Sequence, residues 1–364
     1  MIPLTITRYV GLRFLGAALS VFVGVFMLVV LVDYIEMMRR ASDVPNVSPW
    51  IVAKTSFFRV PQLTEQILPF SVLVGTMACY LNLSRRLELV VARAAGMSAW
   101  QFVAPAVIVA LLLGVVATTL YNPLSAVLRE KSKQLEAEMF GEQRKGARPG
   151  AVAGSWVRQR TDEGQAIIYA VSSQEQGVRL DGVTIFTFDP AGQFLERIEA
   201  PRARLEPGHW RLDQPRIYAS GRPARLQDTH LLKTNLTAAQ VRESFSTPET
   251  VPFWQLPLYI EIAERSGLAA AGYRLQYQVL IARPFLLAAM VILAASVSLR
   301  FFRFGGVPQM VLGGISAGFL LYVMSKVTGD LSKAELMHPA AAAWLPVLAG
   351  GLTGIIVLLH QEDG

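Results

Sequence analysis

The sequence has few of the residues that soluble enzymes use for chemistry. It contains a single cysteine, Cys79, and four histidines in 364 residues. One cysteine excludes an intrachain disulfide, so any folded domain must be held by its own apolar core. The histidines are scattered without a His-x-x-x-His spacing, and they form no Cys/His cluster that predicts a metal site. We therefore expect no bound metal.

Energy-supplying motifs are also missing. The sequence has no Gly-Lys dipeptide and hence no P-loop for a nucleotide. Catalysis by this chain alone is not expected. If it performs transport, the energy must come from a partner or from an ion gradient. The formal net charge of +7 is not arranged as a basic stripe with interleaved aromatics, so anionic lipid is a better partner than nucleic acid.

Charged residues are scarce, at 17%, and hydrophobic residues make up 52% of the chain. An average soluble domain has about 25% charged residues, so much of this chain belongs in a bilayer. Six stretches approach the length of about 20 apolar residues that a spanning helix needs. They are residues 14–35, 67–83, 102–121, 279–299, 308–327 and 340–359. We expect the first to remain as an anchor rather than to be a cleaved signal.

The segment 51–66 precedes the second span and carries Lys54, Arg59 and Glu65. It is predicted to be an amphipathic helix only partly in lipid. Between the third and fourth spans lies a long polar region. The order is therefore three spans, a domain outside the membrane, and three further spans.

The inserted region alternates apolar and polar residues with period two, which is typical of strands. Strands are predicted at 165–172, 178–189, 193–199, 202–206, 209–213 and 230–236, with turns at Asp189-Pro190, Pro207-Gly208 and Ser220-Gly221. Short strands at this spacing favour an antiparallel sandwich or roll. Its interior is either a filled core between two sheets or an open apolar groove for an acyl chain. Residues 252–267 are expected to form an amphipathic helix that returns to the membrane.

A short charged segment separates the second and third spans. Its apolar residues Leu87, Val90, Val91 and Ala94 recur at helical spacing, while Arg86, Glu88 and Arg93 project elsewhere. Gly96 predicts a helix end, and Ser98 with Gln101 predicts a capping box that opens the next helix. We therefore expect a short amphipathic helix at 85–97 that is presented to a partner.

Basic residues in the short loops predict the orientation of the spans. Arg8, Arg13, the 84–99 segment and Arg300 with Arg303 fall on one side, which should be cytoplasmic. Arg39 and Arg40 oppose this assignment from the other side. Six spans then put both termini inside and the strand-rich region outside.

Several ionisable residues lie in or near the spans. Asp33, Arg39 and Arg40 are near the outer end of the first, Arg283 is near the start of the fourth, and Lys326 is near the outer end of the fifth. They either snorkel to the headgroups or line an outward-facing cavity for phosphates. A shared depth favours the cavity for Arg39, Arg40 and Lys326. We expect Arg283 to snorkel, and Asp33 to repel an anionic headgroup unless a base pairs with it.

Gly314 and Gly318 form a small-xxx-small face in the fifth span, where another helix can approach closely. This face is either ordinary packing within the bundle or a mobile seam with a partner chain.

Taken together, several runs resemble the lipopolysaccharide-export permeases of the LptF/LptG type, along nearly the whole chain. They are Arg8-Tyr-Val-Gly11, Leu68-Pro-Phe70, residues 86–98, Lys233-Thr-Asn-Leu236, Leu258-Tyr-Ile260 followed by Gly267, Pro284, and residues 314–323. The forms Glu88-Leu-Val-Val91 and Ile315-Ser-Ala-Gly-Phe319 are more similar to LptG than to LptF.

The resemblance implies the permease subunit of an ABC transporter that extracts lipopolysaccharide from the bacterial inner membrane. Such a subunit pairs with an LptF-like sister permease and two LptB-type ATPases, which bind the ATP and Mg²⁺, so this chain needs no cofactor. Lipopolysaccharide then passes through a periplasmic β-jellyroll to an LptC-type bridge protein. Both termini are cytoplasmic in this arrangement.

The resemblance also implies a division into three regions. Residues 1–128 hold spans one to three with a cytoplasmic coupling helix, 129–265 form the periplasmic β-jellyroll domain with its return helix, and 266–364 hold spans four to six. The fold class is thus an α-helical membrane protein of six transmembrane helices with an all-β domain inserted between the third and fourth.

Residue roles follow from the same resemblance. The ATPase-coupling residues are Arg85, Arg86, Leu87, Glu88, Val91, Arg93, Ala95 and Gly96, with Glu88 matching the family's acidic contact. The substrate-binding residues are Asp33, Arg39, Arg40 and Lys326, where Arg39 and Arg40 match a basic pair near lipid phosphates. Asp33 departs from the lysine of some relatives. Spans one and five are the lateral gates, packed through Gly314, Gly318 and Tyr322.

Two alternatives compete with this assignment. One is a permease of the same class that moves another lipid or a lipoprotein. The other is a non-transporting scaffold or an ion-driven carrier. The carrier should show inverted repeats with broken midplane helices, which we do not find in the sequence, and a scaffold needs no coupling helix.

Overall fold

The computed structural model describes residues 4–42, 47–145, 155–161, 164–174, 177–190, 192–219, 223–237, 241, 248–265, 270–302 and 307–363. Within these residues, six helical segments are long and apolar enough to cross a membrane. They are α1 (Leu4–Ala41), α2 (Pro49–Arg85), α4 to α5 (Ala99–Lys145), α8 (Ala271–Phe302), α9 (Val307–Lys333) and α10 (Pro339–Asp363). All six predicted spans are confirmed.

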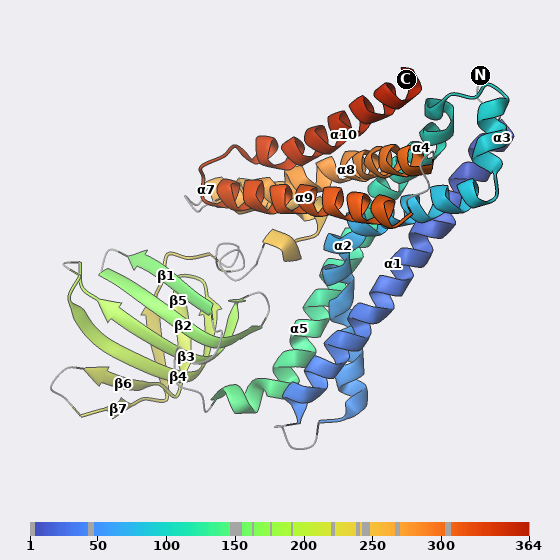
Figure 1. Cartoon of the computed structure of the whole chain (residues 1–364). Helices are drawn as coiled ribbons and strands as arrows, with labels where there is room; N and C mark the ends of the chain where they lie inside the picture. Colours follow the sequence, from blue (N-terminus) through green and yellow to red (C-terminus); the bar gives the residue numbers. More distant parts are fainter. Residues whose placement is uncertain are drawn as a thin grey trace.

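The first three spans are longer than the sequence indicated. The 38 residues of α1 extend over about 57 Å, whereas the hydrocarbon core is about 30 Å thick. The predicted lead-in 51–66 and the span 67–83 form one helix, α2, which continues through Pro61 and Pro69. Figure 1 shows α1, α2 and α5 extending together past the other helices, alongside the strands.

The third span changes its winding partway along. Helix α4 (Ala99–Val116) passes through a π-helical turn, η1 (Ala117–Tyr121), into α5 (Asn122–Lys145). A π turn leaves carbonyl groups out of the regular helical hydrogen-bond ladder and is frequent at functional sites. The predicted domain boundary at residue 128 falls inside α5.

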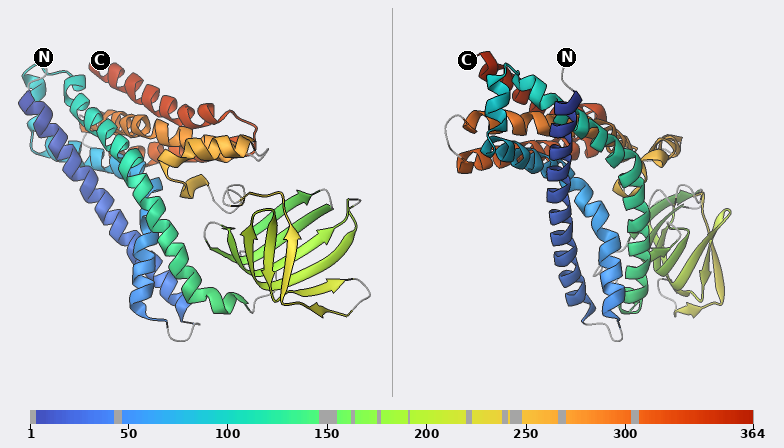
Figure 2. Two further views of the ribbon diagram at one scale, coloured as in Figure 1. Left: turned by 180° about the vertical axis from the view of Figure 1, so that it is seen from behind. Right: turned by 90° about the vertical axis from the view of Figure 1, so that its right-hand side faces the viewer.

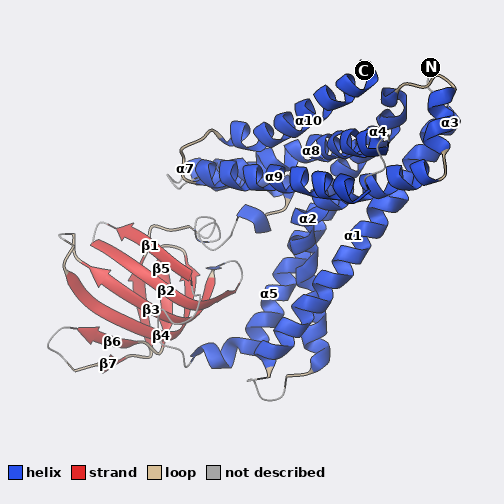
Figure 3. Ribbon diagram, in the orientation of Figure 1, coloured by secondary structure: helices blue, strands red, loops and turns tan. Residues whose placement is uncertain are grey.

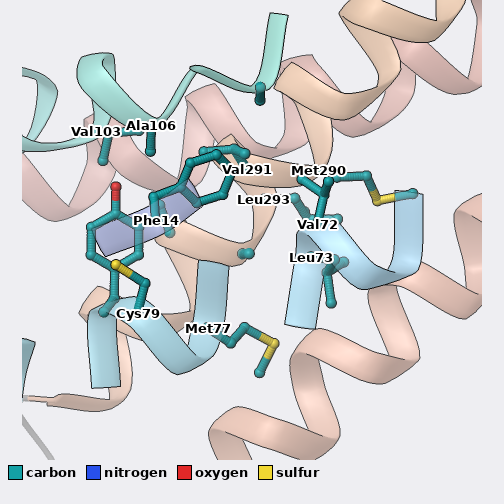
Figure 4. Close-up of a cluster of buried hydrophobic side chains, with 14 of the residues drawn as sticks. Phe14, Val72, Leu73, Met77, Cys79, Val103, Ala106, Met290, Val291 and Leu293 are labelled. Carbon is teal, nitrogen blue, oxygen red and sulfur yellow. The ribbon is translucent and has the colours of Figure 1, made fainter. Parts of the chain in front are cut away.

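The helices pack around α8, most of whose apolar window is buried, while α1 lies at the periphery. The core of the bundle joins α1, α2, α4 and α8 through side chains such as Phe14, Leu73, Val103 and Val291 (Figure 4). All four are nearly inaccessible to solvent. Cys79 is buried in the same core, as the apolar character of the span predicts.

The described residues of the inserted region form an antiparallel sheet of eight strands. They are β1 (Ser155–Thr161), β2 (Gly164–Gln174), β3 (Arg179–Phe188), β4 (Phe194–Glu206), β5 (His209–Asp213), β6 (Arg216–Ala219), β7 (Arg225–Leu226) and β8 (Thr229–Lys233). The order β1-β2-β3-β4-β5-β8 forms the main path, and β6 joins β4 to β7. The strands gather beside the helices (Figure 3), where β2 lies against α5.

The two strands predicted at 193–199 and 202–206 are one strand, β4, and this is a correction. Pro201 has no N–H for a ladder, and opposite it lies Gly182 with a φ of 61°. The pairing of β3 and β4 resumes on both sides of this row. β4 also changes partner there, from β6 before Ala200 to β5 after Pro201. The proline therefore marks a partner change rather than a strand end.

The inner face of the sheet is a packed core. Its fully buried side chains include Ile168, Leu180, Ile198, Trp210 and Leu212. Among the described residues, the interior is thus filled, as in the predicted core, and is not an open groove for an acyl chain. The core belongs to one continuous sheet rather than to two packed sheets. The sequence does not predict β1, β6 and β7 as separate strands. The predicted turn at Ser220-Gly221 lies outside the described residues.

Between residues 248 and 265, three short helical segments lead back to the bundle. They are η3 (Pro248–Thr250), η4 (Phe253–Gln255) and α7 (Leu256–Arg265). The return helix is therefore confirmed, with its described part beginning at Leu256. Gly267 and Arg303, used above, lie outside the described residues.

The chain termini and the segment between α2 and α4 gather at one end of the molecule (Figures 1 and 2). The sheet lies toward the other end. Helix α3 (Glu88–Ala94), which occupies that segment, is thus separated from the strand-rich region by the length of the bundle.

Candidate functional site

The predicted coupling segment forms a helix shorter than expected, with well-defined ends. Leu87 adopts a left-handed conformation, with φ of 61°, and separates α3 from α2. Gly96 has φ of 82°, which ends the helix where the sequence predicted. Ser98 and Gln101 form the predicted reciprocal capping box at the start of α4, with both distances 3.3 Å. Arg85 belongs to the last turn of α2.

Helix α3 is fixed on one side and open on the other. Leu89 is buried in the bundle core, with Ala92 and Met97 packed against it. Leu87 and Val91 are more than 60% exposed, and Val90 is 42% exposed. Exposed apolar residues outside the spans mark an interaction surface. The exposed predicted coupling residues are Arg85, Arg86, Leu87, Val91, Arg93, Ala95 and Gly96, whereas Glu88 is half-buried.

Glu88 is held by the first helix. The Tyr9 hydroxyl donates to both carboxylate oxygens of Glu88, at 2.9 and 3.1 Å. The guanidinium carbon of Arg13 lies 5.0 Å from the centre of the Tyr9 ring. Sequence reasoning noted Tyr9 only as part of a motif before the first span. Because 79 residues separate the partners, spacing alone could not reveal this contact.

Asp33 is paired with a base, which is the condition under which it would not repel an anionic headgroup. The Arg59 guanidinium lies 2.8 Å from Asp33, and the Ser56 hydroxyl donates to the other carboxylate oxygen at 2.7 Å. Arg59 is also 3.5 Å from Glu136, which Arg129 approaches at the same distance. Two carboxylates and two guanidiniums therefore balance one another between α1, α2 and α5.

Arg39 and Arg40 lie at the end of α1 and are largely exposed. Both donate to Glu36 on the same helix, at 3.0 and 2.8 Å. Lys326 lies on a different helix, α9, where its ammonium is 3.8 Å from Asp330. The structure thus does not bring the three predicted cationic residues together within this chain.

Lys326 lines a cavity of about 260 Å³ between α2, α8 and α9. Apolar side chains such as Phe70, Leu286 and Met290 form much of its wall. The remaining wall is charged, with Glu65 and Arg283 between α2 and α8, and with Lys326, Asp330 and Lys333 on the last turns of α9. Glu249 also lines the cavity, so three carboxylates balance three cations in its wall. An apolar chamber with a charged end of this kind suits an amphiphile, whose anionic group would have to replace one of the carboxylates.

Arg283 does not snorkel to a headgroup, and this expectation was wrong. Its side chain is 10% exposed and forms an ion pair with Glu65, which is 6% exposed. The Asn122 amide and the Ser125 hydroxyl donate to the same carboxylate, both at 2.8 Å. A buried guanidinium needs such a partner because it cannot lose its charge. Glu65 was assigned to an amphipathic lead-in, so its partner 218 residues away was not predictable from the sequence.

Gly314 and Gly318 face α2 within the same chain. A Cβ at Gly314 would collide with Met77, and one at Gly318 would approach Leu73 to 2.9 Å. The run Gly314-Ile-Ser-Ala-Gly318 also has the Gly-x-Ser-x-Gly spacing of a nucleophile elbow, but it lies inside a continuous helix without the required strand and turn. Tyr322 is 45% exposed and packs on Phe70, with ring centres 5.9 Å apart.

Other side chains of α9, including Leu312, Phe319 and Leu320, are 59–69% exposed. Helix α1 has a similar exposed series that includes Met27, Leu28 and Leu31. These two spans have the smallest buried shares of their apolar windows among the six. Each therefore has an apolar surface available to lipid or to another membrane helix.

Comparison with known proteins agrees with these features. The family described as "Lipopolysaccharide export system permease LptF/LptG" matches residues 8–360. The lipopolysaccharide export system permease protein LptG of Escherichia coli strain K12 is 23% identical, over 96% of this chain and 98% of that protein. The protein of the same name from Haemophilus influenzae is 23% identical over 94% of this chain and 95% of its own length. The chain therefore belongs to the LptF/LptG family of lipopolysaccharide export permeases.

Proposed function

We propose that this chain is the permease subunit of an ABC transporter that extracts lipopolysaccharide from the bacterial inner membrane and passes it to a periplasmic bridge. The proposed partners are an LptF-like sister permease, two LptB-type ATPases that bind ATP and Mg²⁺, and an LptC-type bridge protein. In this proposal the chain performs no hydrolysis and binds no cofactor itself. Family membership supports the substrate class, and the exposed surface of α3 supports the coupling to an ATPase.

The single observation that carries the proposal is the geometry of α3. A capped helix outside the spans presents Leu87 and Val91 to solvent, with Arg86 and Arg93 also exposed. Its other side is anchored in the bundle by Leu89. A displacement of α3 by a partner would therefore act directly on the packed core, which is the mechanical requirement for coupling.

The orientation supports the same arrangement. α3 and both termini lie at the end of the bundle that the basic residues assign to the cytoplasm. The sheet lies toward the opposite end, which would place it in the periplasm. An ATPase at α3 and a bridge protein at the sheet then bind at opposite ends of the chain.

The exposed apolar faces of α1 and α9 fit a lipid-transferring assembly. In the proposal, each faces the sister permease across a lateral gate, and the Gly314–Gly318 face holds α9 on α2. Arg39 and Arg40 then contact phosphates from the end of α1, and Lys326 contacts them from α9. Asp33 contributes through Arg59, since its own charge is already balanced.

Co-expression and reconstitution test the proposal. The tagged chain should co-purify with an ATPase and a second six-span chain. Proteoliposomes of this complex should release lipopolysaccharide only when ATP is supplied. A complex that releases a lipoprotein or a phospholipid instead would favour the alternative permease, and a chain that isolates alone without ATP-dependent release would exclude both.

Photocrosslinking tests the substrate residues separately. Photoreactive residues at Arg39 and Arg40 should form adducts with lipopolysaccharide, whereas one at Leu359, which is 45% exposed near the end of α10 opposite the sheet, serves as a control. Absence of adducts at both arginines would remove them from the binding site.

A further inference from the structure

The cavity wall includes a segment that belongs to neither the helices of the bundle nor the sheet. We call residues 248–255 the strap; they comprise η3 and η4, between the last strand and α7. Glu249 of the strap lines the cavity, where its carboxylate lies 2.8 Å from the Lys333 ammonium of α9. Gln62 of α2 donates to the Glu249 carbonyl at 3.0 Å. The strap thus bridges two of the three helices that form the cavity.

The strap is also bound to the π-helical turn of the third span. The Trp254 indole donates to the Thr119 carbonyl at 3.2 Å, and the Phe253 amide donates to the Asn122 side chain at 2.9 Å. Asn122 in turn donates to Glu65, the partner of Arg283. Phe253 stacks on Tyr277 of α8, with ring centres 5.7 Å apart. The position of the strap is therefore linked, through Asn122, to Glu65 in the charged wall of the cavity.

The Glu249–Lys333 pair is the contact of the strap that an anion can replace. The side chains are 34% and 46% exposed, so water and solutes can reach both partners. Exposed ion pairs contribute little to stability, about 0–1 kcal/mol. Phosphate oxygens are strong acceptors for a lysine ammonium. Lys326 lies seven residues before Lys333 on the same cavity wall, about 10 Å away along the axis of α9. Two flexible lysine side chains can extend toward each other over this separation, so one phosphate can contact both ammonium groups.

We propose that Lys333 and Lys326 form a binding site for the phosphate of a lipid in this cavity, and that Glu249 occupies Lys333 until the phosphate displaces it. Displacement frees the strap from α9, so that lipid occupancy loosens residues 248–255. This inference rests on the proposed function, because it takes the lipid to be the transported lipopolysaccharide.

Two matched substitutions separate this proposal from a merely structural ion pair. Glu249→Gln removes the carboxylate that competes with phosphate and should tighten binding of lipopolysaccharide. Lys333→Gln removes the ammonium that binds the phosphate and should weaken binding. Each change is expected to be about 2- to 5-fold, which corresponds to an exposed charge interaction. Glu264→Gln disrupts a similar exposed pair with Arg274, away from this cavity, and should leave the affinity unchanged.

The measurement uses the whole transporter complex in nanodiscs. Affinity is determined for lipopolysaccharide and for lipopolysaccharide whose lipid A phosphates have been removed, with hydrogen exchange of residues 248–255 as the second readout. The phosphorylated lipid should raise exchange in the strap, and the dephosphorylated lipid should not. Inorganic phosphate alone should have no effect, because it lacks the acyl chains that fill the apolar wall.

The proposal is overturned if the two substitutions change affinity in the same direction or not at all. It is also overturned if the dephosphorylated lipid raises strap exchange equally, or if inorganic phosphate alone raises it. These failures leave the proposed function intact, provided the wild-type complex still releases lipopolysaccharide with ATP. Loss of that wild-type release would instead contradict the proposed function.

Discussion

Glu65 and Arg283 form a buried ion pair, and replacing one partner should lower the free energy of unfolding more than replacing the other. Glu65→Gln leaves the Arg283 guanidinium, only 10% exposed, with no counter-ion and no means of losing its charge. Removing one partner of a buried pair in this way costs about 3–5 kcal/mol. Arg283→Gln leaves a carboxyl that keeps the hydrogen bonds of Asn122 and Ser125 and can take up a proton. We expect its cost to be nearer 1–3 kcal/mol, as for an incompletely satisfied polar group.

The assay is unfolding of the purified chain in mixed micelles with increasing denaturing detergent. Glu65→Gln should shift the unfolding equilibrium further than Arg283→Gln, by about thirtyfold if the costs differ by about 2 kcal/mol, the separation of the midpoints of the two ranges. The double variant should be more stable than Glu65→Gln alone. Glu264→Gln, which disrupts the exposed pair with Arg274, should stay within about 0.5 kcal/mol of wild type.

Equal costs for the two substitutions would contradict a larger penalty for the unpaired Arg283 guanidinium than for the unpaired Glu65 carboxyl. Equal costs near zero would mean that water in the cavity solvates the pair. Equal large costs would mean that packing, rather than the fixed charge of the arginine, dominates at this position.

Three further predictions follow from other contacts. Tyr9→Phe removes the hydroxyl that donates to Glu88 but keeps the ring beside Arg13. Hydrogen exchange of α3 should therefore rise and the lipopolysaccharide released per ATP should fall, while the complex still assembles. Burial raises the pKa of Glu249, but the Lys333 hydrogen bond, a backbone hydrogen bond and the charges of Lys333 and Lys326 together outweigh burial and hold the pKa below its usual value. The stabilisation from the Glu249–Lys333 pair is therefore complete above about pH 4.5 and is lost as the pH falls through the lowered pKa. Hydrogen exchange of residues 248–255 should rise only in acid. In Glu249→Gln, acid should cause no further rise. Gly318→Ala places a Cβ 2.9 Å from Leu73 and should destabilise the chain by about 1–3 kcal/mol in thermal unfolding, whereas Gly16→Ala, which meets nothing within 4 Å, should not.

Features set by local sequence were predictable. The six spans follow from continuous apolar length, the C-terminal end of α3 follows from Gly96, and the start of α4 follows from the Ser98–Gln101 box. These signals act within a few residues, so no tertiary information is needed to interpret them. The antiparallel insertion was predictable for the same reason, since its alternation and turns are local.

The features that were not predicted from the sequence depend on residues far away in the chain. Pro201 normally interrupts a ladder, yet β4 continues because Gly182 lies opposite and the neighbouring strand changes there. The pairs Tyr9–Glu88 and Glu65–Arg283 join residues 79 and 218 positions apart. A single sequence shows that each group is ionisable or polar, but not which group from another helix balances it. Arg283 was consequently assigned to a headgroup rather than to Glu65.

The most direct test of the account is to measure ATP hydrolysis and lipopolysaccharide release in the same proteoliposomes, with Glu88→Ala or Glu88→Lys in this chain. If α3 couples ATP hydrolysis to release, the variant chain is inserted normally but ATP-dependent release is abolished, because the coupling surface has lost its acidic contact. A Glu88 variant that still releases the full amount of lipopolysaccharide for each ATP hydrolysed would contradict the assignment of α3 as the coupling element.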